Sequence, residues 1–132
     1  MFEFVNVNWT AVVVAALAQI IVGGIWNGIL FVRQFYATHE VAPGFKPNPA
    51  HAFIMVALTI FNSYILAVLF TNLEVATAQD GAVVAFWLWA ALMLPFIVGT
   101  AFATNRNKVI PFELGHTLLA MLAAGIILGI WK

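Results

Sequence analysis

The sequence predicts an all-α integral membrane protein, in which the whole chain, residues 1–132, forms a single domain of four antiparallel transmembrane helices. Composition is the first of two observations that carry this prediction. Charged residues make up 8% of the chain and hydrophobic residues 64%, whereas soluble domains hold about 25% charged residues. A domain this small leaves much of its surface exposed. The excess apolar surface is therefore expected to face lipid.

Four long apolar segments are the second observation. A helix needs about 20 apolar residues to cross roughly 30 Å of hydrocarbon. The sequence offers four such segments, at about residues 9–32, 50–70, 82–102 and 109–131. Within lipid, a single segment satisfies its own backbone hydrogen bonds only as a helix. The short second and third connections predict that the last three helices are sequential antiparallel neighbours.

The ends of these segments carry residues that typically begin or interrupt helices. Asn8 is a candidate N-cap of the first helix, and Trp9 is an aromatic residue of the kind found at membrane interfaces. The proline-rich stretch 43–49 cannot continue a helix and forms the longest connection. Asp80 is expected in the second connection, and Pro111 fits the first turn of the fourth helix.

The distribution of Lys and Arg predicts an orientation. Arg33 and Lys46 lie in the first connection, Arg106 and Lys108 in the third, and none lies in the second. By the positive-inside rule, we expect the first and third connections in the cytoplasm and both termini outside. The expected location is a bacterial cytoplasmic (inner) membrane, with membrane lipid as a partner. No basic cluster exists, so nucleic acid is not an expected partner.

Two glycine pairs at a spacing of four residues indicate close helix packing. They are Gly24 and Gly28 in the first segment, and Gly125 and Gly129 in the fourth. Glycines four apart clear one helix face, so another backbone can approach closely. The pairs are interpreted either as packing within the four-helix unit or as a dimer interface.

Polar residues interrupt two of the apolar segments. Thr59, Asn62, Ser63 and Tyr64 lie in the middle of the second segment, and Asn27 lies in the first. Polar groups at this depth normally face the bundle and find partners there. They indicate interhelical hydrogen bonds, with the lining of a solute path as the alternative.

Glu113 and His116 form the most chemically suggestive pair in the sequence. Their i, i+3 spacing places both side chains on one helix face, and Glu-x-x-His is the spacing used in di-iron carboxylate bundles. His39 and His51 are expected on the same side of the membrane, which allows a metal site built from all four residues. The alternative is a carboxylate at a helix start beside an interfacial histidine. No cofactor is predicted, and the metal site is kept as the alternative.

Three stretches of the chain resemble a bacterial family of small four-helix membrane proteins, domain-of-unknown-function family 1761. They are residues 8–12, 23–31 and 115–119. Trp26, Phe31 and His116 match the family's pattern, whereas Asn27, Gly28 and Ile29 stand where the family usually has Tyr-Ser-Pro. The resemblance implies the four-helix fold and implies no activity.

Three functions are compatible with these residues. The first is a membrane protein without an enzymatic activity, which self-associates or serves as a subunit of a larger membrane assembly. The alternative is a small transporter or channel with a path near Asn62 and Tyr64. The first helix holds Gln19 and Asn27 but no acid, which disfavours proton-coupled antiport. The second alternative is a metal- or cofactor-binding protein centred on Glu113 and His116.

Overall fold

The computed structural model describes residues 4, 6–39, 46, 48–102 and 108–131, and the regular secondary structure of these residues is helical throughout. Four helices in this part of the chain are long and apolar enough to cross a membrane: Trp9–Leu30, Pro49–Asn72, Ala78–Ala101 and Val109–Ile130. The predicted all-α fold with four membrane-spanning helices is therefore confirmed, and the chain is a multi-pass membrane protein.

The first span consists of two helical segments in sequence. Helix α1 (Trp9–Ile25) continues into a π-helical segment, η1 (Trp26–Leu30), and a short helix α2 (Val32–His39) follows. The predicted N-cap is present, because the side-chain oxygen of Asn8 accepts a hydrogen bond from the backbone N–H of Ala11 at 3.2 Å.

The remaining spans are helices α3 (Pro49–Asn72), α4 (Ala78–Ala101) and α5 (Val109–Ile130). Helix α4 begins earlier than predicted, so Asp80 lies in its first turn and not in the connection. The reason is an N-cap at Thr77: its hydroxyl oxygen accepts a hydrogen bond from the backbone N–H of Asp80 at 3.0 Å.

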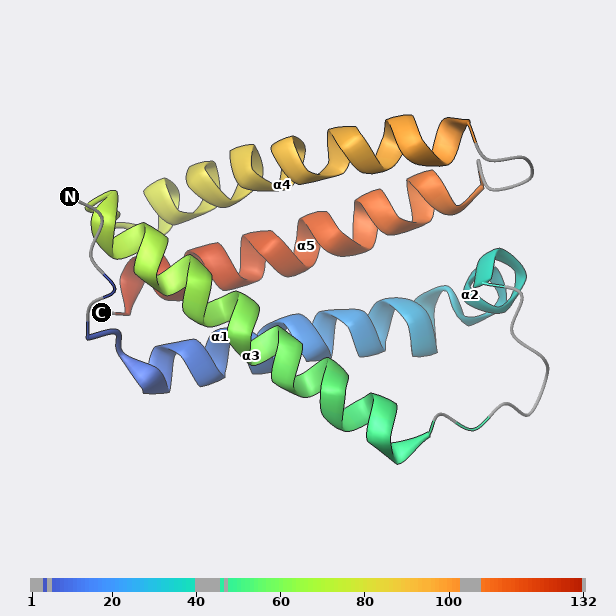
Figure 1. Cartoon of the computed structure of the whole chain (residues 1–132), viewed down its shortest axis with the longest axis horizontal. Helices are drawn as coiled ribbons and strands as arrows, with labels where there is room; N and C mark the ends of the chain where they lie inside the picture. Colours follow the sequence, from blue (N-terminus) through green and yellow to red (C-terminus); the bar gives the residue numbers. More distant parts are fainter. Residues whose placement is uncertain (1–3, 5, 40–45, 47, 103–107, 132) are drawn as a thin grey trace.

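Helix α5 lies between α4 and α1, and α3 packs on α1 (Figure 1). Both termini lie at one end of the bundle, and α2 lies at the other end. Helices α3 and α4 were expected to be direct neighbours, but their principal contacts are with α1 and α5 respectively. Figure 1 shows α3 diverging from α4 toward the end that holds α2. The short connection between them joins the two helices without forcing them to pack along their length.

Glycines explain why α4 pairs with α5. A methyl group at Gly81 would overlap the carbonyl oxygen of Gly125, and one at Gly129 would overlap the carbonyl oxygen of Thr77. The two backbones are therefore in direct contact, which maximises van der Waals attraction between helices in lipid. Gly81 belongs to this contact although it lies outside the predicted glycine pairs.

The buried core occupies the end of the bundle that holds the termini. It is formed by the start of α1 and of α4, by the second halves of α3 and α5, and by the connection between α3 and α4. Its residues are Ala11, Val12, Ala15, Leu66, Ala67, Phe70, Val75, Ala85, Met121, Ala124 and Leu128. Several of these residues are alanines, so the helices approach closely here. At the opposite end α3 diverges from α4, and the interior is hollow.

Candidate functional site

A cavity of about 550 Å³ lies between the four spans. Its volume is in the range of small-molecule sites, about 300–1,000 Å³. The apolar part of its lining consists of Ile20, Gly23, Ala52, Met55, Val56, Leu92, Met93, Ala120 and Met121. The polar part consists of Gln19, Asn27, Thr59, Asn62, Trp89, His116 and Thr117. A largely apolar wall with a few polar groups is typical of a ligand site.

A hydrogen-bonded chain joins α1 to α3 at the deep end of the cavity. The side-chain amide of Asn62 donates to Gln19 Oε1 at 3.1 Å, and Gln19 Nε2 donates to Ser63 Oγ at 2.8 Å. Ser63 is fully buried. Asn62 and Ser63 thus make the interhelical hydrogen bonds that their sequence position favours. Gln19 of α1 connects them, and no sequence pattern identifies it as their partner.

The other two polar residues predicted in α3 behave differently. The hydroxyl of Thr59 donates to the carbonyl of Met55 one turn earlier, at 2.8 Å, so its hydrogen is used within its own helix. Tyr64 stacks on Trp9 with 5.2 Å between ring centroids, and it does not line the cavity. Of the two residues that the sequence suggested for a solute path, Asn62 and Tyr64, only Asn62 therefore lies on the cavity wall.

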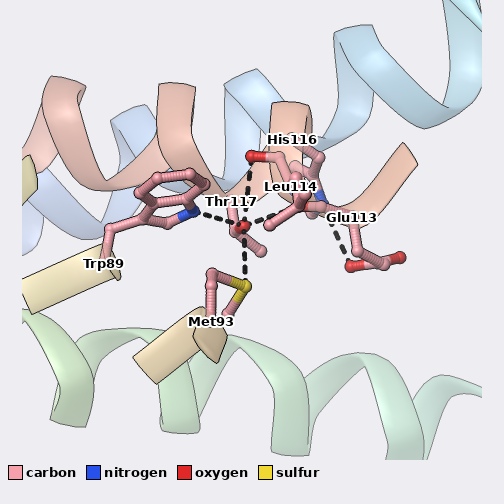
Figure 2. A network of polar contacts seen from close by, with 6 residues as sticks. All are labelled: Trp89, Met93, Glu113, Leu114, His116 and Thr117. Carbon is pink, nitrogen blue, oxygen red and sulfur yellow. Dashed lines mark hydrogen bonds and ion pairs between the residues drawn. The ribbon is translucent and has the colours of Figure 1, made fainter. Parts of the chain in front are cut away.

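Helices α4 and α5 are bonded to each other across the cavity wall by Thr117 (Figure 2). Its hydroxyl oxygen accepts a hydrogen bond from the indole N–H of Trp89 at 2.9 Å, and its own hydrogen goes to the carbonyl of Glu113. The sulfur of Met93 lies 3.5 Å from the same oxygen. These bonds fix the Trp89 ring against the cavity.

Glu113 and His116 come together as their spacing predicts. The Nδ1 atom of His116 lies 3.8 Å from Glu113 Oε2, and the two side chains are 22% and 24% exposed (Figure 2). Nδ1 is buried and has no hydrogen-bond partner. The opposite ring atom, Nε2, lies against Gly23: a β-carbon placed there would be 3.1 Å from it. Gly23 therefore makes room for the imidazole at the cavity wall.

The structure does not complete the metal site that the sequence suggested. His51 lies exposed in the first turn of α3, and the side chain of His39 lies outside the described residues. Among the described side chains, no group of three or more His, Asp or Glu residues is arranged to hold a metal ion. Glu113 and His116 remain a pair, and the four-residue metal site stays a prediction.

The π-helical segment η1 brings two further polar side chains into the interior. Its defining bond joins the backbone N–H of Phe31 to the carbonyl of Trp26 at 2.9 Å. Asn27 lines the cavity, and the Trp26 ring fills the space beside Gly115. Asn27 Oδ1 and Trp26 Nε1 are both buried without a hydrogen-bond partner. Single π-helical turns occur frequently at functional sites.

An aromatic cluster surrounds this segment. The Trp26 ring lies 4.5 Å from Phe31 and 6.1 Å from Phe112, and Phe35 of α2 lies 6.4 Å from Phe112, measured between centroids. Edge-to-face and tilted contacts at these distances are favourable. They hold α2 against the start of α5. Sequence reasoning named Trp26 and Phe31 but missed Phe112, which is buried.

The two glycine pairs have different surroundings. Gly125 and Gly129 contact α4 within the unit, as described above. At Gly24 and Gly28, apart from the adjoining residues and the helix's own backbone, no described atom lies within 4 Å of the place where a β-carbon would stand. This face of the first span has no packing partner within the described part of the chain.

The sequence matches the family described as "Protein of unknown function (DUF1761)" over residues 10–129. The chain belongs to the DUF1761 family. The match includes the cavity-lining parts of all four spans, so the cavity is built entirely from the family's own region. No match was found among curated proteins or among solved structures. The description of the DUF1761 family states no activity, and the function is therefore argued from the cavity.

Proposed function

We propose that this protein binds a small lipid-soluble molecule in the cavity between its four spans. The observation that supports this proposal is the cavity itself, about 550 Å³ lined by residues of α1, η1, α3, α4 and α5. The cavity is open to the surface of the bundle, because its lining residues Met55, Val56 and Leu92 are all exposed. An empty apolar space within lipid would forfeit many van der Waals contacts, and a bound molecule restores them.

The geometry favours entry from the membrane. Helices α3 and α4 contribute opposite walls, and neither makes its principal packing contacts with the other. An apolar molecule dissolved in lipid can pass between them without crossing the polar membrane surface. Three methionines line the cavity, Met55, Met93 and Met121. Their flexible, polarisable side chains adapt to ligands of different shape.

A photoactivatable alkane tests this proposal in lipid nanodiscs. The probe carries a diazirine and no polar group, and labelled residues are identified by peptide mass spectrometry. We expect saturable labelling of the cavity wall, including Met93 and Met121. Trp87 is exposed and does not line the cavity. Labelling confined to such outward-facing side chains, rising linearly with probe concentration, would refute the proposal.

Two tryptophan substitutions in α3 provide the matched comparison. Both side chains are exposed, Val56 to 42% and Ile54 to 51%, but only Val56 lines the cavity. V56W fills the cavity and is expected to abolish the saturable component, since the added indole occupies ligand space. I54W adds the same group on the outer surface and is expected to leave saturable labelling unchanged.

Self-association is a second candidate function, favoured by the open face at Gly24 and Gly28. Two copies of this face can approach closely, as paired glycines do in membrane dimers. We expect the double variant G24L/G28L to convert a dimer to a monomer in cross-linking and native mass measurements in detergent. G99L is the control, because Gly99 also faces open space but has no glycine four residues away. A monomeric parent protein would contradict this candidate.

A further inference from the structure

We infer that the occupant of the cavity is an anionic phospholipid from the leaflet at the end of the bundle that holds α2. One of its acyl chains lies in the cavity, and its phosphate stays at the membrane surface. This inference rests on the proposed binding function and specifies the chemical class of the ligand. It follows from three properties of the molecule: the depth of the cavity, the place where the cavity opens and the distribution of charge between the two ends of the bundle.

The cavity is as deep as one leaflet of the bilayer. On α3 its lining extends from Ala52, in the first turn, to Asn62. At a rise of 1.5 Å per residue this separation is about 15 Å, which is half of the roughly 30 Å of hydrocarbon in a bilayer. In each span, the lining residue farthest from the α2 end lies near the middle of the helix: Gln19, Asn62, Trp89 and Met121. A chain that enters from the α2 end therefore reaches the bilayer midplane.

A hydrogen-bonded floor and the buried core close the cavity at that depth. Gln19 Oε1 accepts a hydrogen bond from Asn62, and Gln19 Nε2 donates to Ser63. Beyond this level the helices pack closely, through core residues such as Ala15 and Leu66. Because the Gln19 amide is bonded through both its oxygen and its nitrogen, the methyl end of an acyl chain displaces no hydrogen bond of this side chain.

The cavity opens sideways, between α3 and α4. Met55 and Val56 of α3 and Leu92 of α4 line the cavity and are exposed. No described Lys, Arg, Asp or Glu is among the lining residues. An acyl chain can thus move from the surrounding bilayer into the cavity while its headgroup stays at the surface. The bilayer supplies this ligand at a very high local concentration, which favours occupancy even at modest affinity.

The two ends of the bundle differ in charge. Among the described residues, the exposed cations Arg33, Lys46 and Lys108 lie toward the α2 end, where the cavity is. The exposed carboxylates Glu74 and Asp80 lie at the opposite end, where α3 is joined to α4. The cavity therefore lies in the leaflet whose surface carries the exposed cations.

These cations adjoin the helices that form the cavity. Lys108 is the N-cap residue of α5, Lys46 precedes α3, and Arg33 lies in α2 directly after the first span. Lys and Arg at the membrane surface attract anionic lipid headgroups. Charge complementarity at this surface thus favours a phospholipid with a net negative charge over a zwitterionic one.

Two photoactivatable phosphatidylglycerols, in nanodiscs of phosphatidylcholine, test the position of the acyl chain. One probe carries a diazirine at the end of an acyl chain and the other carries it beside the ester group. Labelled residues are identified by peptide mass spectrometry. We expect the chain-end probe to label the floor near Asn62 and Met121, and the ester-side probe to label the entrance near Ala52. Labelling should saturate as the mole fraction of each probe rises.

The tryptophan variants of α3 show whether the labelled chain lies inside the cavity. V56W places an indole in the cavity and is expected to abolish the saturable labelling by both probes. I54W places the same group outside the cavity and is expected to leave the labelling unchanged.

A chain-end probe with a phosphatidylcholine headgroup tests the role of charge. At equal mole fraction, we expect the phosphatidylglycerol probe to label the floor about fivefold more strongly, as expected from one basic side chain near the surface. The variant R33Q/K46Q/K108Q is expected to make the two headgroups label equally. E74Q is the control, because it removes a charge at the opposite end, and it is expected to keep the preference.

The outcomes separate this inference from the proposed function. Saturable labelling in the expected order of depth, with a preference for phosphatidylglycerol, supports both. Saturable labelling by the photoactivatable alkane but by neither phospholipid overturns the inference while the binding function stands. Labelling of the floor by the ester-side probe, or equal labelling by the two headgroups in the parent protein, also overturns the inference alone. Absence of saturable labelling by any probe, the alkane included, overturns both.

Discussion

Gly115 shows how one missing side chain shapes the wall behind the cavity. The Trp26 ring occupies the space where a β-carbon would stand, 2.6 Å from its nearest ring atom. We expect G115A to lower the free energy of unfolding by about 1–3 kcal/mol, because the buried indole must move within a packed cluster. The measurement is the thermal midpoint in detergent by circular dichroism. The control is G99A, because a β-carbon at residue 99 would stand in open space. Equal thermal midpoints for the two variants would contradict this explanation.

Glu74 is a second residue whose backbone conformation leads to a prediction. It follows Leu73, the C-cap of α3, and has a positive φ of 54°. The backbone N–H of Val75 donates to the Phe70 carbonyl at 3.0 Å, and that of Glu74 to Thr71 at 3.2 Å. These two bonds form a Schellman motif, in which glycine is the preferred residue at this position.

We therefore expect Glu74→Gly to stabilise the protein by about 0.5–1 kcal/mol, since glycine adopts positive φ without a steric cost. The thermal midpoint should rise. Glu74→Ala is the control and should give no rise, because alanine keeps the β-carbon that causes the strain. A lower midpoint for the glycine variant would show that the conformation carries no strain.

The structural roles of some single residues could be predicted from the sequence, whereas the roles of others could not. Asn8 was identified as a cap because capping depends on its immediate neighbours in the chain. Asn62 and Ser63 were identified as hydrogen-bonding residues because polar groups in mid-membrane need partners. The partner itself, Gln19, comes from another helix 43 or 44 residues away. Only the packing of α1 on α3 reveals it.

At the scale of helices, the contact between α4 and α5 depends on three glycines. A β-carbon at Gly125 would lie 2.5 Å from the carbonyl oxygen of Gly81 and 2.6 Å from the β-carbon of Ala85. The obstacle includes backbone, which cannot rotate away as a side chain can. We expect G125A to lower the free energy of unfolding by an amount in the upper part of the range of about 1–3 kcal/mol. The measurement is unfolding in a denaturing detergent.

The control for this substitution is G99A, which adds the same methyl group to a helix face with no neighbour in the described part of the chain. It is expected to be neutral or slightly stabilising, because alanine has a higher helix propensity than glycine. If G125A and G99A unfold alike, the backbone contact between α4 and α5 does not contribute to stability.

The existence of the four helices followed from the sequence, whereas their pairing did not. Length and hydropathy decide whether a segment spans the membrane. Pairing depends on which small residues of different helices face one another, and Gly81 lies just outside the third segment that the sequence predicted, residues 82–102. The divergence of α3 from α4, which creates the cavity, therefore could not be predicted. The same holds for η1, since no residue pattern distinguishes a π-helical turn from the α-helix around it.

For the whole molecule, we propose that the end holding both termini is outside and that the first and third connections are cytoplasmic, in a bacterial inner membrane. The positive-inside rule supports this orientation through Arg33, Lys46, Arg106 and Lys108, of which Arg106 lies outside the described residues. A reporter enzyme active only outside the cytoplasm, fused after residue 132, is expected to be active. Activity of a cytoplasm-only reporter at the same position would contradict this orientation.

The central claim is that the space between the four spans holds a lipid-soluble molecule. Crystals grown from a lipid phase containing a bromoalkane test it most directly, because bromine is located by its anomalous scattering. We predict a bromine peak inside the cavity, between Met55, Met93 and Met121, in the parent protein and in I54W but not in V56W. Bromine found only on the outer surface of the helices, with the cavity free of ligand in the parent protein, would contradict the claim.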